Sequence, residues 1–313
     1  MRKLFSRTIL GILVLGAILA GCGRAPNGPN ENAWRFLPGD VRSLTLDSFR
    51  QGRQCWVYLP PNYAYSGRRY PVLYITDGQA VFNWMHLNRV YEELIRRGEI
   101  EPLIVVAITE PSWPVRVLEL TPPWPDGYDP GGGGGLLCLQ AIRDTLEPKV
   151  DRLYRTLPGT ASTAIGGMSL GGLLAAYAGF AFDSTFGSVA AFSPSYWWGD
   201  TTSIYEFAQN RGRPENLQRF YQDTGYPEDN WIGSMEQLLI SLGFVPGQDL
   251  ISITVPGAEH VDAAWEHRFP QMLRFLFPRS AQPEAAGAAH SELMTSPKRA
   301  TPCRPPAPVA PAR

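Results

Sequence analysis

One serine lies in a sequence pattern that suits a nucleophile. Ser169 is the centre of a G-x-S-x-G pattern at 167–171. The hydroxyl of such a serine reacts well when a sharp strand-to-helix turn presents it to substrate and a nearby base removes its proton. Glycines suit that turn because its strained backbone and close helix packing leave little room for side chains. An apolar run at 161–166 and a small-residue run at 170–180 predict the required strand and helix, so we predict Ser169 as the nucleophile.

The chain has four histidines, and their order narrows the choice of base. In α/β hydrolases, the enzymes that carry this motif on such a turn, the acid and the histidine follow the serine. His86 precedes the serine, and His290 belongs to a tail with almost no large apolar residues. His267 falls within a predicted helix, whereas His260 follows the predicted strand 250–255 in a loop. We predict His260 as the base and keep His267 as the alternative.

The acid that orients the histidine is expected just after the strand 219–223. Asp223, Glu228 and Asp229 compete for that role. Asp223 is still within the strand, where its side chain is expected to bond to local backbone. Glu228 lies beyond a Gly-Tyr-Pro turn, from which it can reach His260, hold its tautomer and stabilise the imidazolium. We predict Glu228 as the acid, with Asp229 as the main alternative.

Alternating strands and helices are expected to position these side chains. Continuous apolar runs predict strands at 55–59, 70–76, 103–108, 161–166, 189–192, 219–223 and 250–255. Helical spacing predicts helices at 136–153 with a kink at Pro148, at 170–180, and at 263–277 with a bend at Pro270. Strands separated by helices imply βαβ crossovers, so we predict an α/β fold with a mostly parallel central sheet and helices on both faces. The glycine run 131–135 is expected to be a mobile loop.

The first residues resemble the signal peptide of a bacterial lipoprotein. A basic start and an apolar run at 9–20 precede Cys22, as in a lipobox. The run is shorter than the roughly 20 residues that a membrane span needs. We expect a signal peptide at 1–21, a lipid anchor on Cys22, a polar tether at 22–37, a catalytic domain at 38–279 and a disordered Ala/Pro-rich tail at 280–313. No aspartate follows the cysteine, which favours the periplasmic face of the outer membrane over the inner membrane.

The charge and cysteine content of the chain limit its possible binding partners and metal sites. A formal net charge of −1 argues against nucleic acid or acidic lipid as the main partner. Apart from the lipobox cysteine the chain has Cys55, Cys138 and Cys303, with no C-x-x-C spacing, so we expect no structural zinc site. We expect Cys55 and Cys138 to be buried free thiols, with a disulfide between them as the alternative. No metal or cofactor is expected, and the oligomeric state is open.

The segment YPVLYITDGQ at 70–79 resembles a characteristic segment of the putative esterase family of α/β hydrolases. Further similarities in the family's order lie at 116–121, 166–172, 193–198, 223–228 and 257–260, with Trp265 and Arg268. Together they cover about 43–278. The family includes enterochelin esterases, the esterase D group, some feruloyl esterases and the mycobacterial mycolyltransferases, so the resemblance is specific for the family and not for the substrate.

That resemblance implies a catalytic triad and an oxyanion hole. The triad would be Ser169, His260 and Glu228. The oxyanion hole would use the N–H of Leu170 and an N–H near Gly78 and Gln79.

Three further side chains are candidates for substrate contact. Arg116 either holds a substrate oxygen or pairs with Glu119. Trp197 and Trp198, with two tryptophans of the segment 111–130, either line an aromatic or acyl pocket or pack over the sheet.

These expectations describe a serine esterase that acts on a small-molecule ester through an acyl-enzyme. An acyltransferase with the same triad, and a non-catalytic binding lipoprotein on a hydrolase scaffold, are the alternatives. No triad member is missing, which argues against the second alternative. The sequence leaves the physiological ester open.

Overall fold

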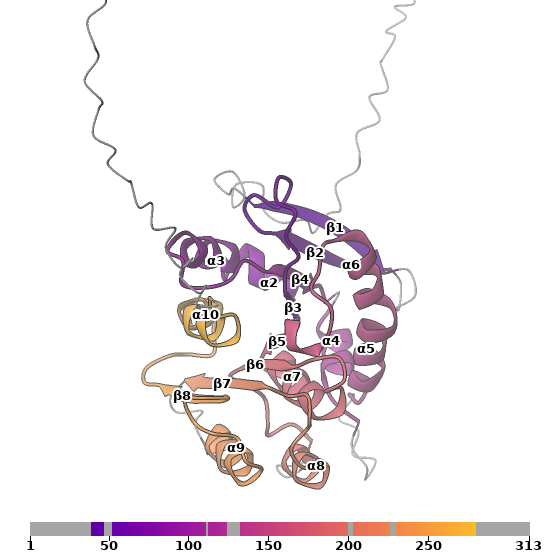
Figure 1. Ribbon diagram of the computed structural model, residues 1–313. Helices are drawn as coiled ribbons and strands as arrows, with labels where there is room; N and C mark the ends of the chain where they lie inside the picture. Colours follow the sequence, from indigo (N-terminus) through magenta and orange to yellow (C-terminus); the bar gives the residue numbers. More distant parts are fainter. Residues whose placement is uncertain are drawn as a thin grey trace, which may run out of the picture. The chain divides into compact units, whose positions relative to one another are not determined.

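A central β-sheet organises the domain (Figure 1). The computed structural model describes residues 39–46, 52–110, 112–123, 132–199, 203–225 and 230–279. The strands are β1 (Asp40–Leu46), β2 (Arg53–Leu59), β3 (Val72–Ile75), β4 (Ile104–Ile108), β5 (Thr163–Met168), β6 (Ser188–Phe192), β7 (Arg219–Gly225) and β8 (Leu250–Val255). Within the described ranges they form one sheet in the order β1-β2-β4-β3-β5-β6-β7-β8. β1, β2 and β4 pair antiparallel, and all the other pairs are parallel.

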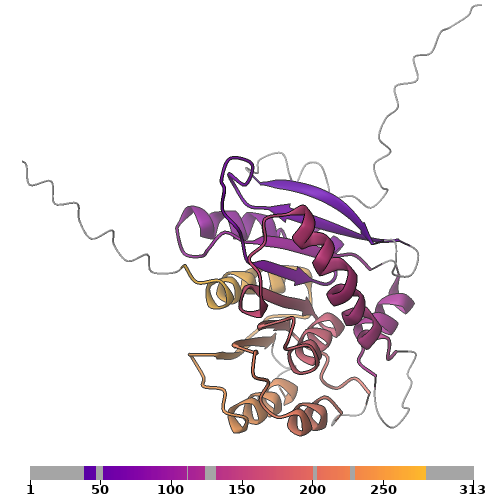
Figure 2. The same cartoon turned by 45° about the vertical axis from the view of Figure 1, so that its right-hand side comes forward.

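Helices cover both faces of this sheet, and the strands from β3 to β7 are accordingly buried on both sides. One face is covered by α2 (Gly78–Asn83), α3 (Leu87–Arg96) and α10 (Asp262–Leu276). The other is covered by α4 (Trp113–Leu120), α5 (Gly135–Ala141), α6 (Glu147–Leu153), α7 (Leu170–Ala181), α8 (Ser203–Arg211) and α9 (Asn230–Ser241). The turned view separates α3 and α10 from the α5–α6 segment on the opposite side (Figure 2). None of the helices in the described ranges is long and apolar enough to cross a membrane.

The predicted strands and the predicted α/β class are confirmed, with differences at the edges. β1 was not predicted, because it is an edge strand with one buried residue, Leu44, among its described side chains. The predicted helix 136–153 is two helices joined by a π-helical turn, Ile142–Leu146. Pro148 in the first turn of α6 has no N–H to donate, and the wider turn accommodates that loss. α10 continues through Pro270.

The described part of the glycine run is packed, which corrects the expectation of a mobile loop. The N–H of Gly133 donates to Thr121 Oγ1 at 2.7 Å, and the N–H of Gly135 donates to Thr121 O at 2.8 Å. A Cβ added to Gly135 would lie 2.7 Å from that same carbonyl oxygen. Glycine is therefore needed here for a close approach of two backbones between α4 and α5.

Cys55 and Cys138 are buried free thiols, as expected. Burial raises the pKa of the Cys55 thiol to about 12, so the thiol is neutral and serves as a small apolar core group.

The carboxyl ends of the parallel strands meet along one edge of the sheet. Asp77 follows β3, Ser169 follows β5, Ser193 follows β6 and His260 lies in the loop after β8. Open α/β sheets bind their ligands at this edge, because loops from several strands converge there. The predicted nucleophile and base therefore come from loops at the same edge of the sheet, after β5 and β8.

Candidate active site

Ser169 occupies a strained turn between β5 and α7. Its backbone has φ 58° and ψ −118°, a conformation that non-glycine residues adopt at a cost of about 1–3 kcal/mol. Dense packing around the turn holds it in place. A Cβ on Gly167 would lie 2.5 Å from the backbone carbon of Gly171, and one on Gly171 would lie 2.2 Å from Thr76 Oγ1. The glycines of the motif are thus required by the close contact of strand, turn and helix.

The serine hydroxyl faces a cavity of about 260 Å³ at the strand ends. His260 lines the same cavity, so the structure brings the predicted nucleophile and the predicted base to one site. Ser169 Oγ lies 3.2 Å from the hydroxyl of the buried Ser195, and the Ser195 N–H donates to Ser169 O at 3.1 Å. Ser195 was not identified from the sequence as a contact of the nucleophile.

The N-terminus of α7 lies directly behind the nucleophile. Leu170 is the first residue of that helix, and its side chain is buried. The first N–H groups of a helix have no partner within the helix and carry the positive end of its dipole. The N–H of Leu170 is one of these helix N-terminal groups and belongs to the residue that follows Ser169.

His260 extends from an exposed loop between β8 and α10. Its ring meets the edge of the Trp265 ring with the centroids 4.9 Å apart. Trp265 is fixed in turn, since its Nε1–H donates to Ser193 Oγ at 3.2 Å. His267, the alternative base, is on α10 and lines a different hollow. The geometry thus favours His260.

A buried ion pair supports this loop from below. Arg268 Nη1 lies 2.8 Å from Asp223 Oδ1, and the two side chains are 3% and 0% exposed. The Tyr221 hydroxyl donates to Asp223 Oδ2 at 2.7 Å, and Arg268 also donates to Ser193 Oγ at 3.1 Å. Burial raises the pKa of Asp223 to about 6, although the charge of Arg268 acts in the opposite direction. Asp223 is therefore a structural residue whose carboxylate forms an ion pair with Arg268.

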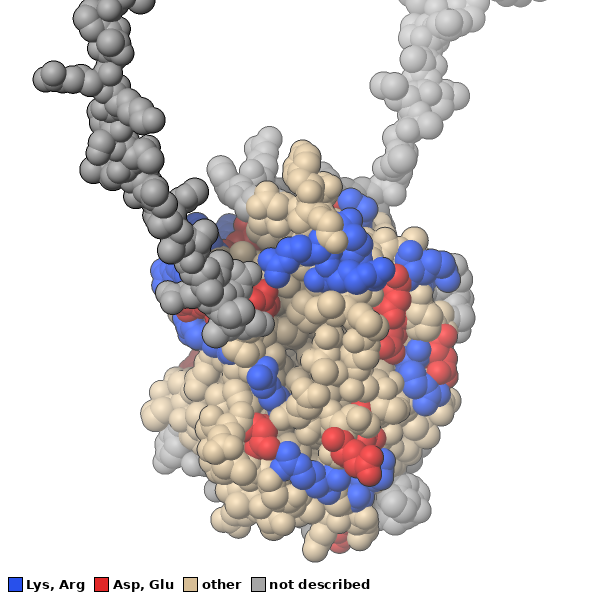
Figure 3. Space-filling model, in the orientation of Figure 1, with Lys and Arg blue, Asp and Glu red and all other residues tan. Residues whose placement is uncertain are grey.

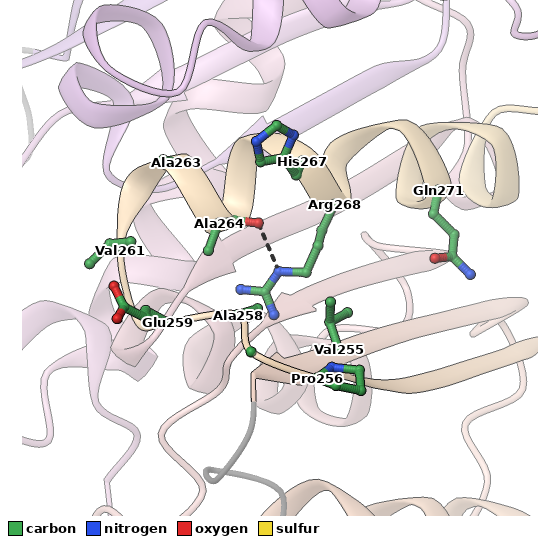
Figure 4. A pocket seen from close by; sticks show the side chains of 11 residues that line it. Val255, Pro256, Ala258, Glu259, Val261, Ala263, Ala264, His267, Arg268 and Gln271 are labelled. Carbon is green, nitrogen blue, oxygen red and sulfur yellow. Dashed lines mark hydrogen bonds between the residues drawn. The ribbon is translucent and has the colours of Figure 1, made fainter.

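A second, larger hollow lies beside the histidine loop (Figure 4). It measures about 550 Å³ and is lined by residues 255–259, by Val261 and by one side of α10, with Arg268 between them. Arg268 Nε–H donates to Ala264 O at 3.1 Å across its wall. Neither Ser169 nor His260 lines this hollow, whereas both line the smaller cavity.

Asp77 and Arg116 form an ion pair on the nucleophile's side of the cavity. Arg116 donates from Nε to Asp77 Oδ1 at 2.6 Å and from Nη2 to Asp77 Oδ2 at 2.8 Å. The same Nη2 donates to the carbonyl of Met168, the residue before the nucleophile, at 3.2 Å. The expected alternative partner, Glu119, pairs instead with Arg53 at 2.7 Å. Arg116 is thus engaged by Asp77 and by the nucleophile turn.

Gly78 and Gln79, implied as the second oxyanion element, begin α2 next to this pair. A Cβ on Gly78 would lie 2.8 Å from the Ala107 backbone, so only glycine fits. Gln79 Nε2 donates to Glu110 O at 2.9 Å, and Glu110 N–H donates back to Gln79 Oε1 at 3.2 Å. This paired amide contact fixes α2 to the end of β4. Burial and the charge of Asp77 raise the pKa of the Glu110 carboxyl well above its usual range.

Several predicted residues are not brought to the cavity. Trp197 is 50% exposed, while Trp198 packs against the core, and neither lines the Ser169 cavity. Their rings contact one another, with centroids 5.8 Å apart. Glu228, Asp229 and Cys22 lie outside the described residues. Asp77 and Asp262 do line the cavity, and neither was predicted as a site residue because the cavity is formed by segments distant in the sequence.

Comparison with known proteins identifies the family. The family model described as putative esterase matches residues 47–276. An uncharacterized protein, YbbA of Bacillus subtilis, is 27% identical over 241 residues, which cover 72% of this chain and 92% of YbbA. The iron(III) enterobactin esterase of Dickeya dadantii is 28% identical over 195 residues, which cover 59% of this chain. The match spans 42% of that esterase, so the chain covers less than half of its length.

Solved structures share the fold. The siderophore hydrolase EstB from Aspergillus nidulans has a TM-score of 0.63 at 23% identity, over 78% of this chain and 96% of EstB. The enterobactin esterase FES from Shigella flexneri has a TM-score of 0.62 at 22% identity, over 76% of this chain and 58% of FES. The chain belongs to the putative esterase family, carboxylic-ester hydrolases of the α/β-hydrolase class.

Proposed function

We propose that the chain hydrolyses a small-molecule carboxylic ester through an acyl-enzyme on Ser169, with His260 as general base and Glu228 as its orienting acid. The observation that carries the proposal is the strained Ser169 turn, which opens into the cavity that His260 also lines. The paired hydroxyl of Ser195 and the packed glycines hold the nucleophile ready without substrate.

The reaction proceeds in two halves. Ser169 Oγ attacks the ester carbonyl carbon while His260 takes the hydroxyl proton, and the developing oxyanion is held by N–H groups at Leu170 and at Gly78–Gln79. The bond to the alcohol oxygen breaks, and the alcohol leaves with the proton from His260. Water then attacks the acyl-serine with His260 again as base. The bond between the acyl carbon and Ser169 Oγ breaks, His260 returns the proton to Oγ, and the carboxylic acid departs.

Hydrolysis of p-nitrophenyl butyrate by wild type and by Ser169→Ala tests the nucleophile. The substitution is expected to lower kcat about 10⁴-fold or more. Ser241→Ala, an exposed serine at the end of α9, is the matched control and is expected to keep wild-type activity. A fluorophosphonate is expected to label the peptide that contains Ser169. Equal rates of ester hydrolysis in wild type and Ser169→Ala would refute the proposal.

The acid is tested separately. Glu228→Gln is expected to lower kcat strongly while the protein stays folded, because the imidazolium loses its stabilising charge. Asp229→Asn is the neighbouring control and is expected to remain active. A reversal of the two effects would assign the acid to Asp229.

The relatives narrow the first substrates to test. Enterobactin and triacetylfusarinine C appear in the names of esterases similar to this chain. We suggest a panel of substrates that contains siderophore esters, feruloyl esters, thioesters and acyl sugars. Comparison of their kcat/KM values would rank the ester classes. Addition of an alcohol acceptor distinguishes hydrolysis from acyl transfer, since only the latter yields a new ester.

We also propose that Cys22 is acylated and anchors the domain to the cell envelope, on the periplasmic face of the outer membrane. Support comes from the lipobox at 19–22. A Cys22→Ser variant is expected to lose metabolic labelling by a palmitate analogue and to leave the membrane fraction.

Charged side chains of both signs surround a central area with few charges on the face in Figure 3, as expected for a protein whose ligand is a small molecule.

A further inference from the structure

The cavity at Ser169 contains a carboxylate that the proposed catalytic mechanism does not use. Asp262 is the first residue of α10, two positions beyond His260, and lines the same cavity as the nucleophile. Its side chain is half-buried. No ion pair or hydrogen bond reaches its carboxylate from the part of the chain that the structure describes.

The arginine that lines this cavity does not balance that charge. Arg116 is bound by both carboxylate oxygens of Asp77, at 2.6 and 2.8 Å. The charges of Asp77 and Arg116 therefore cancel. Asp262 then gives the described lining a net negative charge when His260 is neutral. Burial and the charge of Asp77 raise the pKa of Asp262, so the carboxylate experiences both desolvation and repulsion. A cation placed in the cavity would favour the charged form of Asp262 and so offset both effects.

The remaining side chains that line the cavity are suited to the apolar groups of an organic cation. Met85 and Ala80 are apolar, and Trp113 and Trp265 contribute aromatic surface to the cavity. Trp113 is 66% exposed, and Arg116 lies over its ring, 5.5 Å from the centroid, so this ring already makes one cation–aromatic contact. Carboxylate and aromatic surface together are the groups by which proteins recognise alkylammonium ligands.

We propose that Asp262 is a specificity-determining residue that selects esters carrying a cationic, alkylammonium-type group close to the ester bond. The proposal rests on the proposed hydrolysis at Ser169. Asp262 acts by attracting the cationic end of the substrate, and the reacting carbonyl is still held by the serine and the oxyanion donors. A substrate with a carboxylate in that place is expected to be disfavoured, because it would face an unpaired negative charge.

Esters paired by shape and differing in charge provide the test. Butyrylcholine and 3,3-dimethylbutyl butyrate place the cation, or its carbon isostere, on the alcohol side. Methyl 4-(trimethylammonio)butyrate and methyl 5,5-dimethylhexanoate do the same on the acyl side. For each, kcat/KM is measured by pH-stat titration of the acid released, with wild type, Asp262→Asn, Asp262→Glu and Asp144→Asn.

Wild type is expected to prefer the cationic member by about fivefold in at least one pair, the size expected of one partly solvated charge pair. Asp262→Asn is expected to lose that preference, with the larger change in kcat/KM for the cationic member. Asp262→Glu is expected to retain part of it. Asp144→Asn makes the same change in net charge on the exposed π-helical turn, where Asp144 pairs with Arg143, and is expected to keep the preference.

Equal kcat/KM for both members of both pairs in wild type would overturn the proposal, and so would a preference that survives in Asp262→Asn. If the neutral esters are hydrolysed by wild type and not by Ser169→Ala, the proposed function stands even where the cation preference fails. If Ser169→Ala hydrolyses them as fast as wild type, the proposed function fails as well.

Discussion

The two halves of the candidate active site are built in opposite ways. The predicted nucleophile, Ser169, lies on a turn between a fully buried strand and a helix in which eleven residues are buried, and close contacts of the glycines hold this turn in place. The histidine lies in an exposed loop between β8 and α10, beside a hollow of about 550 Å³. The position of Ser169 is set by tight packing in the core. The position of His260 depends on a few side chains of α10, above all Trp265 and Arg268.

His260→Ala should separate activity from stability most completely. The substitution removes the proposed base, so kcat is expected to fall about 10⁴-fold or more. Because His260 is exposed, the free energy of unfolding is expected to change by about 0.5 kcal/mol or less. Urea unfolding and an ester assay measure the two quantities. His267→Ala is the matched control, and a comparable loss of activity there would shift the role of base to His267.

Arg268→Met should show how much the histidine side depends on its buried ion pair. Removal of the arginine leaves Asp223 buried without its cation, which is expected to cost about 3–5 kcal/mol at pH 8. The pKa of Asp223 is already raised to about 6, and it should rise further without Arg268. A folded-state pKa above the unfolded value means that the folded form binds the proton more tightly, so stability falls as pH rises through that range.

The loss in Arg268→Met should accordingly be smaller at pH 5 than at pH 8, as measured by urea unfolding at both values. Arg274→Met on the same helix is the control. Arg274 pairs with Glu99 at the surface, with side chains 46% and 30% exposed, and its removal is expected to cost about 1 kcal/mol or less. Equal losses for the two variants would mean that burial of the ion pair is unimportant.

Gly167→Ala tests whether the serine side depends on close packing. The added methyl would lie 2.4 Å from Thr76 Oγ1 and 2.5 Å from the Gly171 backbone, so we expect a loss of about 2–3 kcal/mol together with a fall in kcat. Gly233→Ala in α9 meets nothing within 4 Å and is expected to be neutral or slightly stabilising. A Gly167→Ala protein with wild-type stability and activity would contradict a rigid nucleophile turn.

Gln79→Ala should have the smallest effect. It removes the two hydrogen bonds that join α2 to the Glu110 backbone, and about 1 kcal/mol of stability is expected to be lost. If these bonds hold the second oxyanion donor in place, kcat should fall more than KM rises. A change in KM alone would indicate a role in ground-state binding.

The same contrast explains which parts the sequence could predict. Ser169 could be predicted as the nucleophile because the backbone requirements of its turn are local and appear as glycines beside it. His260 could be predicted as the base by chain order and elimination among four histidines. The pairing of Asp77 with Arg116 joins the start of α2 to α4, which are far apart in the sequence, and no local pattern encodes it. β1 was missed because its exposed side chains lack the apolar run of a central strand.

The central position of β3 has a consequence for how the chain reaches its native state. β3 pairs on one side with β4 and on the other with β5, so Val72 must meet Thr163 about ninety residues later in the chain. Contacts of such sequence separation form slowly, because a long loop must close before they stabilise anything. Until β5 is made, one edge of β3 is an apolar strand without its neighbour, the kind of segment that associates with other chains. Synthesis of the domain should therefore be most vulnerable to aggregation between the emergence of β3 and that of β5.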